Sequence, residues 1–152
     1  MLLVRHAKAG ERGRWDGPDR LRPLTEKGWE QARQLSDQLA GYGATRVVSS
    51  PYVRCVQTVE PLAERLGLPV EESDALAEGA TTGQLDELLG SLRSETAVLS
   101  THGDVIPTLL DHLVERDGLY LPSDYPCAKG STWVLHGDGD GCVTRAEYLP
   151  AP

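Results

Sequence analysis

The chain has 152 residues and a mass of 16.5 kDa, a length that favours one compact domain over residues 1–152. With 39% hydrophobic, 25% charged and 5% aromatic residues and no Phe, the composition is typical of a globular protein with a core of Leu, Val and Ala. The formal charge of −8 argues against nucleic acid or a membrane surface as a partner, because both require Lys and Arg to neutralise phosphate.

Targeting signals and cysteine motifs are absent from the sequence. No run approaches the ~18 apolar residues of a membrane span, and Met1–Val4 is far too short for a signal peptide, so we expect a cytoplasmic protein. Cys55, Cys127 and Cys142 are odd in number and lack a CxxC spacing. They predict neither a disulfide framework nor a zinc site, and we interpret them as packing residues.

The first predicted element is a buried strand at Met1–Arg5. Thr25 can cap the first helix, whose apolar residues are three and four apart and which should end near Gly41–Gly43. After a short strand at Arg46–Ser49, Ser50 is interpreted as a helix cap with Pro51 at the first helical position. Pro61 is expected to break or kink that helix midway.

A third strand is predicted at Pro69–Glu72, and Thr81 with Gln84 matches a capping box at the start of a leucine-rich helix. Ala97–Ser100 is typical of another buried strand, and the helix after it has an apolar face of Val105, Ile106, Leu109, Leu110 and Leu113. The last two strands are expected at Ser131–His136 and Cys142–Tyr148, joined by the glycine-rich turn 137–141.

Strands that alternate with helices indicate an α/β fold built from βαβ units. We expect a three-layer αβα sandwich with a mostly parallel central sheet and an antiparallel edge strand from the last hairpin. Residues 7–24 and 117–130 are long irregular stretches, and such loops in compact domains are usually functional or disordered.

Polar residues follow three of the predicted strands, where ligands bind in open α/β sheets. Arg5 and His6 end the first strand, Ser49 and Ser50 the second, and Thr101-His102-Gly103 follows a later one. Arg54 falls in the first turn of the helix after Ser50. We therefore expect two histidines and two arginines, His6, His102, Arg5 and Arg54, to converge on one crevice.

This convergence suits a phosphoryl group. Guanidinium groups bind phosphate oxygens with bidentate charge-assisted bonds, and helix N-termini add backbone donors. The same cations lower the pKa of a nearby imidazole, which would leave His6 neutral and nucleophilic near pH 7. A phosphoryl group passing to His6 would have its charge balanced by Arg5, Arg54 and His102, with no metal or other cofactor required.

Basic residues gather directly after His6, against the sign of the whole chain. Residues 7–24 contain five bases, Lys8, Arg12, Arg14, Arg20 and Arg22, against the three acids Glu11, Asp16 and Asp19. Such a local reversal of charge could receive an anionic substrate, although basic loop residues are often simply solvated. The candidate substrate-binding residues are Lys8, Arg22, Ser50 and Lys129.

Four ordered segments resemble the histidine phosphatase superfamily, also called phosphoglycerate-mutase-like. They are Arg5-His6-Ala7, Leu24–Gly28, Ser49–Thr58 and Thr101-His102-Gly103, which together span most of the chain. The resemblance implies a phosphoglycerate-mutase-like fold, with His6 phosphorylated and Arg5, Arg54 and His102 binding the phosphoryl group. It also implies that Glu78 protonates the leaving oxygen and then activates water. Ala7 stands where most members have Gly and resembles the small SixA-type phosphohistidine phosphatases, some of which lack a strong acid.

A second resemblance is to the C-terminal domains of proteins that join a MutT-type Nudix domain to a histidine phosphatase domain. It rests on Lys129–Leu135 and Glu115–Gly118 and implies nucleoside di- and polyphosphates as substrates. Two alternatives stay open: a phosphohistidine protein phosphatase that acts on a phosphorylated protein, and a non-catalytic phosphate-binding module. Mutase activity is disfavoured, because the short chain offers little material to enclose a product between transfers.

Overall fold

The computed structural model describes residues 1–152 and has six strands and four α-helices in alternating order. The strands are β1 (Leu2–Arg5), β2 (Arg46–Ser49), β3 (Val70–Glu72), β4 (Ala97–Thr101), β5 (Thr132–Gly137) and β6 (Val143–Leu149). The helices are α1 (Glu26–Leu39), α2 (Val53–Leu66), α3 (Thr82–Ser91) and α4 (Val105–Asp117). Short 3₁₀ turns occupy Arg12–Arg14, Asp19–Leu21, Ala40–Tyr42 and Asp74–Leu76.

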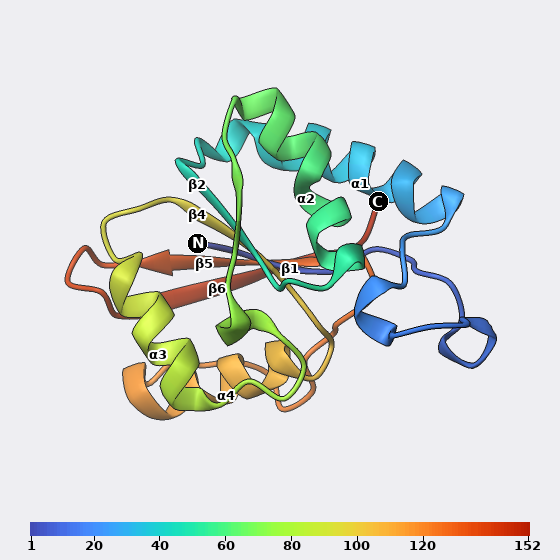
Figure 1. The fold of residues 1–152 in the computed structure, drawn as a ribbon. Coiled ribbons are helices and arrows are strands. Elements are labelled where there is room, and N and C mark those ends of the chain that lie inside the picture. The colour runs from blue at the N-terminus through green and yellow to red at the C-terminus, as the bar shows by residue number, and fades with distance from the viewer.

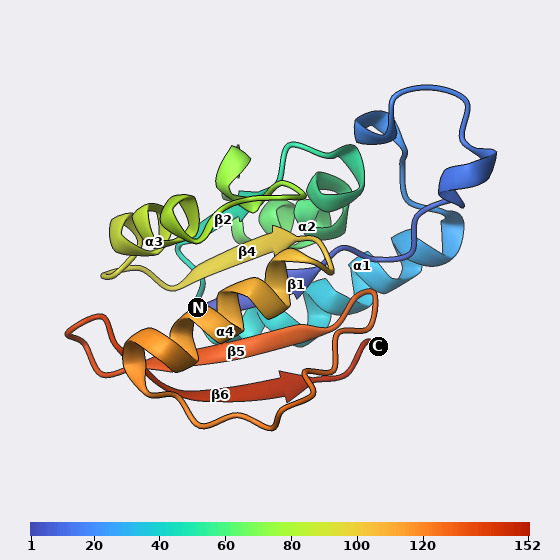
Figure 2. The same ribbon diagram turned by 90° about the horizontal axis from the view of Figure 1, so that it is seen from below.

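One six-stranded sheet has the order β3-β2-β4-β1-β5-β6. The first four strands in this order run parallel, whereas β5 pairs antiparallel with both β1 and β6. The predicted mostly parallel sheet with an antiparallel edge is therefore confirmed, and the antiparallel part is the whole C-terminal hairpin. Figure 2 shows β5 and β6 side by side along this edge.

Two hydrophobic cores cover the two faces of the sheet, because alternate residues of each strand point to opposite sides. Leu2 and Val4 of β1 join a cluster with residues of α1 and α2, whereas Leu3 joins a larger cluster with residues of α3 and α4. Figure 1 shows α1 and α2 on one side of the sheet and α3 and α4 on the other. The three-layer αβα sandwich is confirmed.

The predicted cap of α1 and the capping box of α3 are both present. The Thr25 hydroxyl accepts from the backbone N–H of Gly28, and Thr81 and Gln84 exchange their two capping bonds. All five predicted apolar residues of α4 are buried. Tertiary packing therefore agrees with the local sequence signals at these helices.

The prediction for the start of α2 is wrong. The helix begins at Val53 with Tyr52 as its N-cap residue, so Ser50 is not the cap and Pro51 is not the first helical residue. The Ser50 hydroxyl lies 2.8 Å from Nε2 of His102, in the interior. The buried His102 ring thus binds the Ser50 hydroxyl, which the local sequence pattern predicts as a helix cap.

Nor does α2 break at Pro61, because the helix continues to Leu66. Proline removes one backbone donor from the helix. However, Val59 and Leu62 on either side of Pro61 are buried in the same core cluster. Their burial holds both halves of the helix against the sheet.

No helix of the protein is both long and apolar enough to cross a membrane.

Candidate active site

The carboxyl ends of β1, β2 and β4 bring the predicted site residues together. The backbone N–H of His6 donates to the carbonyl of Thr101 at 2.9 Å, and that of Ser50 donates to Ser100 at 2.8 Å. The rings of His6 and His102 are consequently 5.5 Å apart between centroids, in an edge-to-face arrangement. Sheet register alone therefore places one histidine beside the other.

His6 is buried, with 6% of its surface exposed, and its Nδ1 lies 2.8 Å from the carbonyl oxygen of Ala7. Because a carbonyl can only accept, Nδ1 carries the proton, and Nε2 of the neutral ring keeps its lone pair. Burial, with contributions from the positive charge of Arg54 and from His102 and Arg5, lowers the pKa of His6 to about 3. The ring is therefore a neutral imidazole at neutral pH, as a nucleophile must be.

His102 is also buried and contacts polar groups through both ring nitrogens. Its Nε2 lies 2.8 Å from the Ser50 hydroxyl, and its Nδ1 lies 3.4 Å from a carboxylate oxygen of Glu78. Burial and then the charge of Arg54 lower the pKa of His102 to about 4, against the opposing effect of Glu78. The contact with Ser50 thus fixes the orientation of the His102 ring.

Arg54 is fully buried and is bound by two carboxylates. Its Nη2 lies 2.8 Å from Glu78 and 3.0 Å from Asp19, and its Nη1 donates to the Asp19 carbonyl at 2.9 Å. Asp19 also pairs with Arg12 and Arg22, so one carboxylate on the 7–24 loop joins three arginines. Together these groups hold the loop over the carboxyl ends of the strands.

Arg5 lies against the backbone of Gly103. Its Nη1 donates to the carbonyl of Cys127, and a Cβ added at Gly103 would come within 2.8 Å of the guanidinium carbon. A side chain at position 103 would therefore have to displace the Arg5 guanidinium group. The Nε–H groups of Arg5 and Arg54 are buried without a hydrogen-bond partner, so each has a donor left over.

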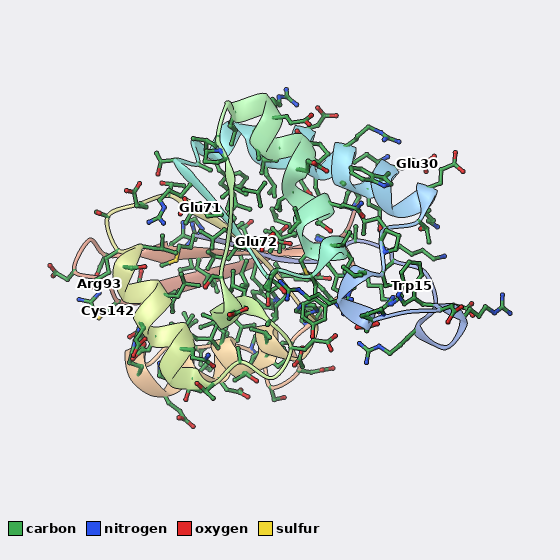
Figure 3. All side chains as sticks on the ribbon, viewed as in Figure 1. Trp15, Glu30, Glu71, Glu72, Arg93 and Cys142 are labelled. Atoms are coloured by element: carbon green, nitrogen blue, oxygen red, sulfur yellow. The ribbon has the colours of Figure 1, made fainter.

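A cleft of about 630 Å³ opens at this end of the sheet. Of the predicted residues, Arg5, His6, Lys8, Arg22, Glu78 and Lys129 line it, whereas Arg54 and His102 are buried behind Glu78 and Asp19. The other lining residues are Ala9, Gly10, Glu11, Arg12, Gly103 and Asp104. Figure 3 shows Trp15, which belongs to the 7–24 loop, far from Arg93 and Cys142 at the opposite end of the sheet.

The structure treats the four candidate substrate-binding residues differently. Lys8 and Lys129 line the cleft and have no carboxylate within ion-pair distance. Arg22 lines it too but is 5% exposed and is bound to Asp19 and to the carbonyl of Gly10. Ser50 is fully buried and contacts His102 instead of the cleft.

Sequence reasoning missed two residues that shape the site. Asp19 was counted only as a loop acid, yet it bridges to Arg54, 35 positions away. Thr58 accepts from the backbone N–H of Ala7 at 2.9 Å and donates to the carbonyl of Arg54 at 2.7 Å, and so ties β1 to α2. The one sequence signal that points to Thr58 is its position at the end of the Ser49–Thr58 segment, which carries part of the family resemblance.

The cysteines are all free and take no part in the cleft lining. Cys55 is a packing residue as predicted, and burial raises the pKa of its thiol to about 12. Cys127 is half-buried and touches the larger core, but Cys142 is exposed, so its interpretation as a packing residue is wrong. Cys142 follows the 137–141 turn, where little of the chain can cover it.

A mostly parallel sheet between two layers of helices, with two histidines and two arginines gathered at the carboxyl ends of its strands, defines the class of this α/β protein. A sequence model described as histidine phosphatase superfamily (branch 1) matches residues 1–87. The chain therefore belongs to the histidine phosphatase superfamily. The predicted membership of this superfamily is confirmed.

Individual relatives agree with this assignment. The chain is 41% identical over its full length to an 8-oxo-(d)GTP phosphatase of Mycolicibacterium smegmatis, of which it covers 48%. It therefore spans about half the length of that relative. Over 99% of the chain it is 30% identical to a probable phosphoglycerate mutase GpmB of Salmonella arizonae, of which it covers 76%.

A solved structure of the protein histidine phosphatase SixA complexed with tungstate resembles the fold, with a TM-score of 0.77 at 22% identity. The match covers 97% of this chain and 92% of that one. The phosphoglycerate-mutase-like fold is thus confirmed.

Proposed function

We propose that this protein is a metal-independent phosphohydrolase that transfers a phosphoryl group from a small substrate to Nε2 of His6 and then to water. The observation that carries the proposal is the state of His6: a neutral ring with Nδ1–H bonded to Ala7 and Nε2 free, beside Arg5 and His102. A neutral imidazole among cations is both a nucleophile and a neighbour of anion-binding groups.

Arg5, Arg54 and His102 are the proposed phosphoryl-binding groups. Arg54 now binds the carboxylates of Asp19 and Glu78, so an incoming phosphoryl group would compete with both for its Nη atoms. The unpartnered Nε–H groups of Arg5 and Arg54 would gain an acceptor. Charge-assisted bonds of this kind strengthen as negative charge spreads over the transferring group.

Glu78 is the proposed acid and base. Its carboxylate lines the cleft with His6, and Thr101 holds the segment before it by donating to the carbonyl of Leu76 at 2.7 Å. In the first step the P–O bond to the leaving group breaks as the Nε2–P bond forms, and Glu78 in its protonated form gives its proton to the leaving oxygen and becomes a carboxylate. In the second step that carboxylate takes a proton from water as the water oxygen bonds to phosphorus and the N–P bond breaks, which restores neutral His6 and protonated Glu78.

The proposed substrates are nucleoside di- and polyphosphates. The support is the full-length similarity to a protein whose name says that it acts on 8-oxo-(d)GTP, although the chain covers only 48% of that relative. The cleft volume lies in the range of small-molecule sites. The proposed partners are thus small phosphorylated molecules, and the proposed location is the cytoplasm.

A second candidate is a phosphohistidine protein phosphatase. The specific observation in its favour is Ala7, which follows the nucleophile where the commonest family pattern has Gly, as in the SixA-type resemblance. Ala7 is fully buried here and is held by Thr58. Rates on a nucleoside diphosphate and on a phosphorylated histidine protein separate the two candidates, and a preference for the protein would favour this one.

The test of the mechanism compares His6→Ala with His136→Ala, a half-exposed histidine of β5 outside the cleft. In chelator-treated buffer, His6→Ala should lose turnover by at least about a thousandfold, because the nucleophile is gone. It should also lose the acid-labile phosphate that quenched wild-type protein and His136→Ala carry. Metal-free hydrolysis retained by His6→Ala would falsify the mechanism.

A further inference from the structure

Two of the three lysines in the sequence line the His6 cleft. Lys8 and Lys129 are cleft residues, whereas Lys27 is exposed on α1 and does not line it. The chain has a formal charge of −8 and contains twelve arginines but only three lysines, so two lysines in one cleft are a local concentration of positive charge. Lysine is a compact point charge that binds phosphate without the planar geometry of arginine.

The backbones of Lys8 and Lys129 are joined through the side chain of Gln31. Gln31 of α1 accepts from the N–H of Lys8 at 3.0 Å and donates to the carbonyl of Lys129 at 3.3 Å. The N–H of Gly130 donates to the carbonyls of Arg5 and His6 at 3.1 and 3.2 Å. Both lysines are thus anchored to the end of β1 that carries His6.

Neither lysine forms an ion pair with an acid of the cleft, and two of the three lining acids pair with arginines. Glu78 pairs with Arg12 and Arg54, and Glu11 pairs with Arg14. Asp104 accepts from the backbone N–H of Gly79. Partial burial and then the positive charges of Arg5, Arg22, Lys8 and Arg54 lower the pKa of Lys129.

We propose that Lys8 and Lys129 form a second phosphate subsite, so that the cleft takes a phosphoanhydride such as a nucleoside diphosphate in preference to a phosphate monoester. The terminal phosphoryl group would bind at His6, Arg5 and Arg54, and the adjoining phosphate would bind the two ammonium groups. This inference rests on the proposed function and assigns the residues that would bind the second phosphate of its substrates.

The subsite also bears on the leaving group. When Nε2 of His6 bonds to the terminal phosphorus, the bridging P–O bond breaks and its electron pair stays on the adjoining phosphate. That oxygen is a weak base, and two ammonium groups beside it balance the added charge. An anhydride would therefore depend less on a proton from Glu78 than an alkyl phosphate. Water then attacks the phosphorus on His6 and releases orthophosphate.

Binding of inorganic pyrophosphate and inorganic phosphate tests the subsite without turnover. In His6→Ala protein, calorimetry should find pyrophosphate bound at least about tenfold more tightly than phosphate. Adding Lys8→Gln and Lys129→Gln, which keep the polar stems, should weaken pyrophosphate binding by roughly ten- to a hundredfold and phosphate binding by less than about threefold. Lys27→Gln, which removes the same charge outside the cleft, should change neither.

Two results would overturn the subsite: pyrophosphate bound no better than phosphate, or equal weakening of both anions by the lysine substitutions. The latter would mean that the lysines only raise the general potential of the cleft. Thermal unfolding of each variant confirms that it is folded. A wild-type protein with no metal-free turnover of any phosphate would refute the proposed function, while pyrophosphate binding would still decide the subsite.

Discussion

Asp19 is the acid that joins three arginines at the site. Its carboxylate pairs with Arg12, Arg22 and Arg54, and only 29% of its side-chain surface is exposed. Because Arg54 is fully buried, a bound anion must share it with Asp19 or displace that carboxylate. The site therefore carries a built-in competitor for its own ligand.

Asp19→Asn should consequently bind inorganic phosphate more tightly, by roughly two- to tenfold, because an amide competes less well for a guanidinium group. Titration of the His6→Ala protein with phosphate measures the change. Asp16→Asn, an exposed acid of the same loop, is the matched control. Weaker phosphate binding in Asp19→Asn would show instead that Asp19 holds Arg54 in its working position.

The role proposed for Glu78 predicts a dependence on the leaving group. Glu78→Gln should reduce hydrolysis of an alkyl phosphate by ~10²–10⁴-fold, because a poor leaving oxygen needs its proton. Nitrophenyl phosphate, with a good leaving group, should be affected much less in its first step. Rapid-quench measurement of phosphoenzyme formation compares the two, and equal losses on both substrates would rule out the acid role.

At the scale of elements, helix α1 starts directly on the backbone of the cleft loop. The N–H and hydroxyl of Thr25 both donate to the carbonyl of Lys8, and a Cβ added at Gly28 would lie 2.0 Å from that oxygen. Gly28 is thus required by a close approach between helix α1 and the loop that follows His6. The same contact fixes the backbone of Lys8.

Gly28→Ala should therefore destabilise the protein by about 1–3 kcal/mol, although alanine is normally the better helix residue. Gly90→Ala in α3, with nothing near its added Cβ, should instead be neutral or stabilise by up to ~1 kcal/mol. Urea unfolding of both variants measures the difference. Equal effects of the two substitutions would contradict the close approach.

At the scale of the whole molecule, the two buried histidines couple folding to pH. Their pKa values are lowered from 6.5 to about 3 for His6 and about 4 for His102. Between pH 6.5 and about 4 the unfolded chain therefore binds protons that the folded protein does not. The free energy of unfolding consequently falls as the pH falls through this window.

Each histidine should contribute roughly 2 kcal/mol to that loss near pH 5. Urea unfolding near pH 7 and near pH 5 should thus show that the free energy of unfolding decreases less between these two pH values for His6→Asn than for the wild type. His136→Asn, at a half-exposed position, should keep the wild-type decrease. An unchanged decrease in His6→Asn would mean that its ring is protonated in the folded protein.

The order of the elements and the residues at the strand ends can be predicted from the sequence. Strand periodicity, the caps at Thr25 and Thr81, and the apolar face of α4 are local signals, and tertiary packing agrees with them. The carboxyl ends of parallel neighbours meet at one edge, so the positions of His6 and His102 follow from their place after β1 and β4.

The partners of these residues, in contrast, depend on how the whole chain folds. Ser50 bonds to His102 instead of capping α2, Asp19 reaches Arg54 across the loop, and Gln31 ties Lys8 to Lys129. No periodicity encodes such contacts, because they join side chains far apart in the chain and depend on where the irregular 7–24 segment settles. Burial also determines the charge state and the partners of these side chains. It lowers the pKa of His6 and so keeps the ring neutral, and it leaves the fully buried Arg54 to pair with the carboxylates beside it.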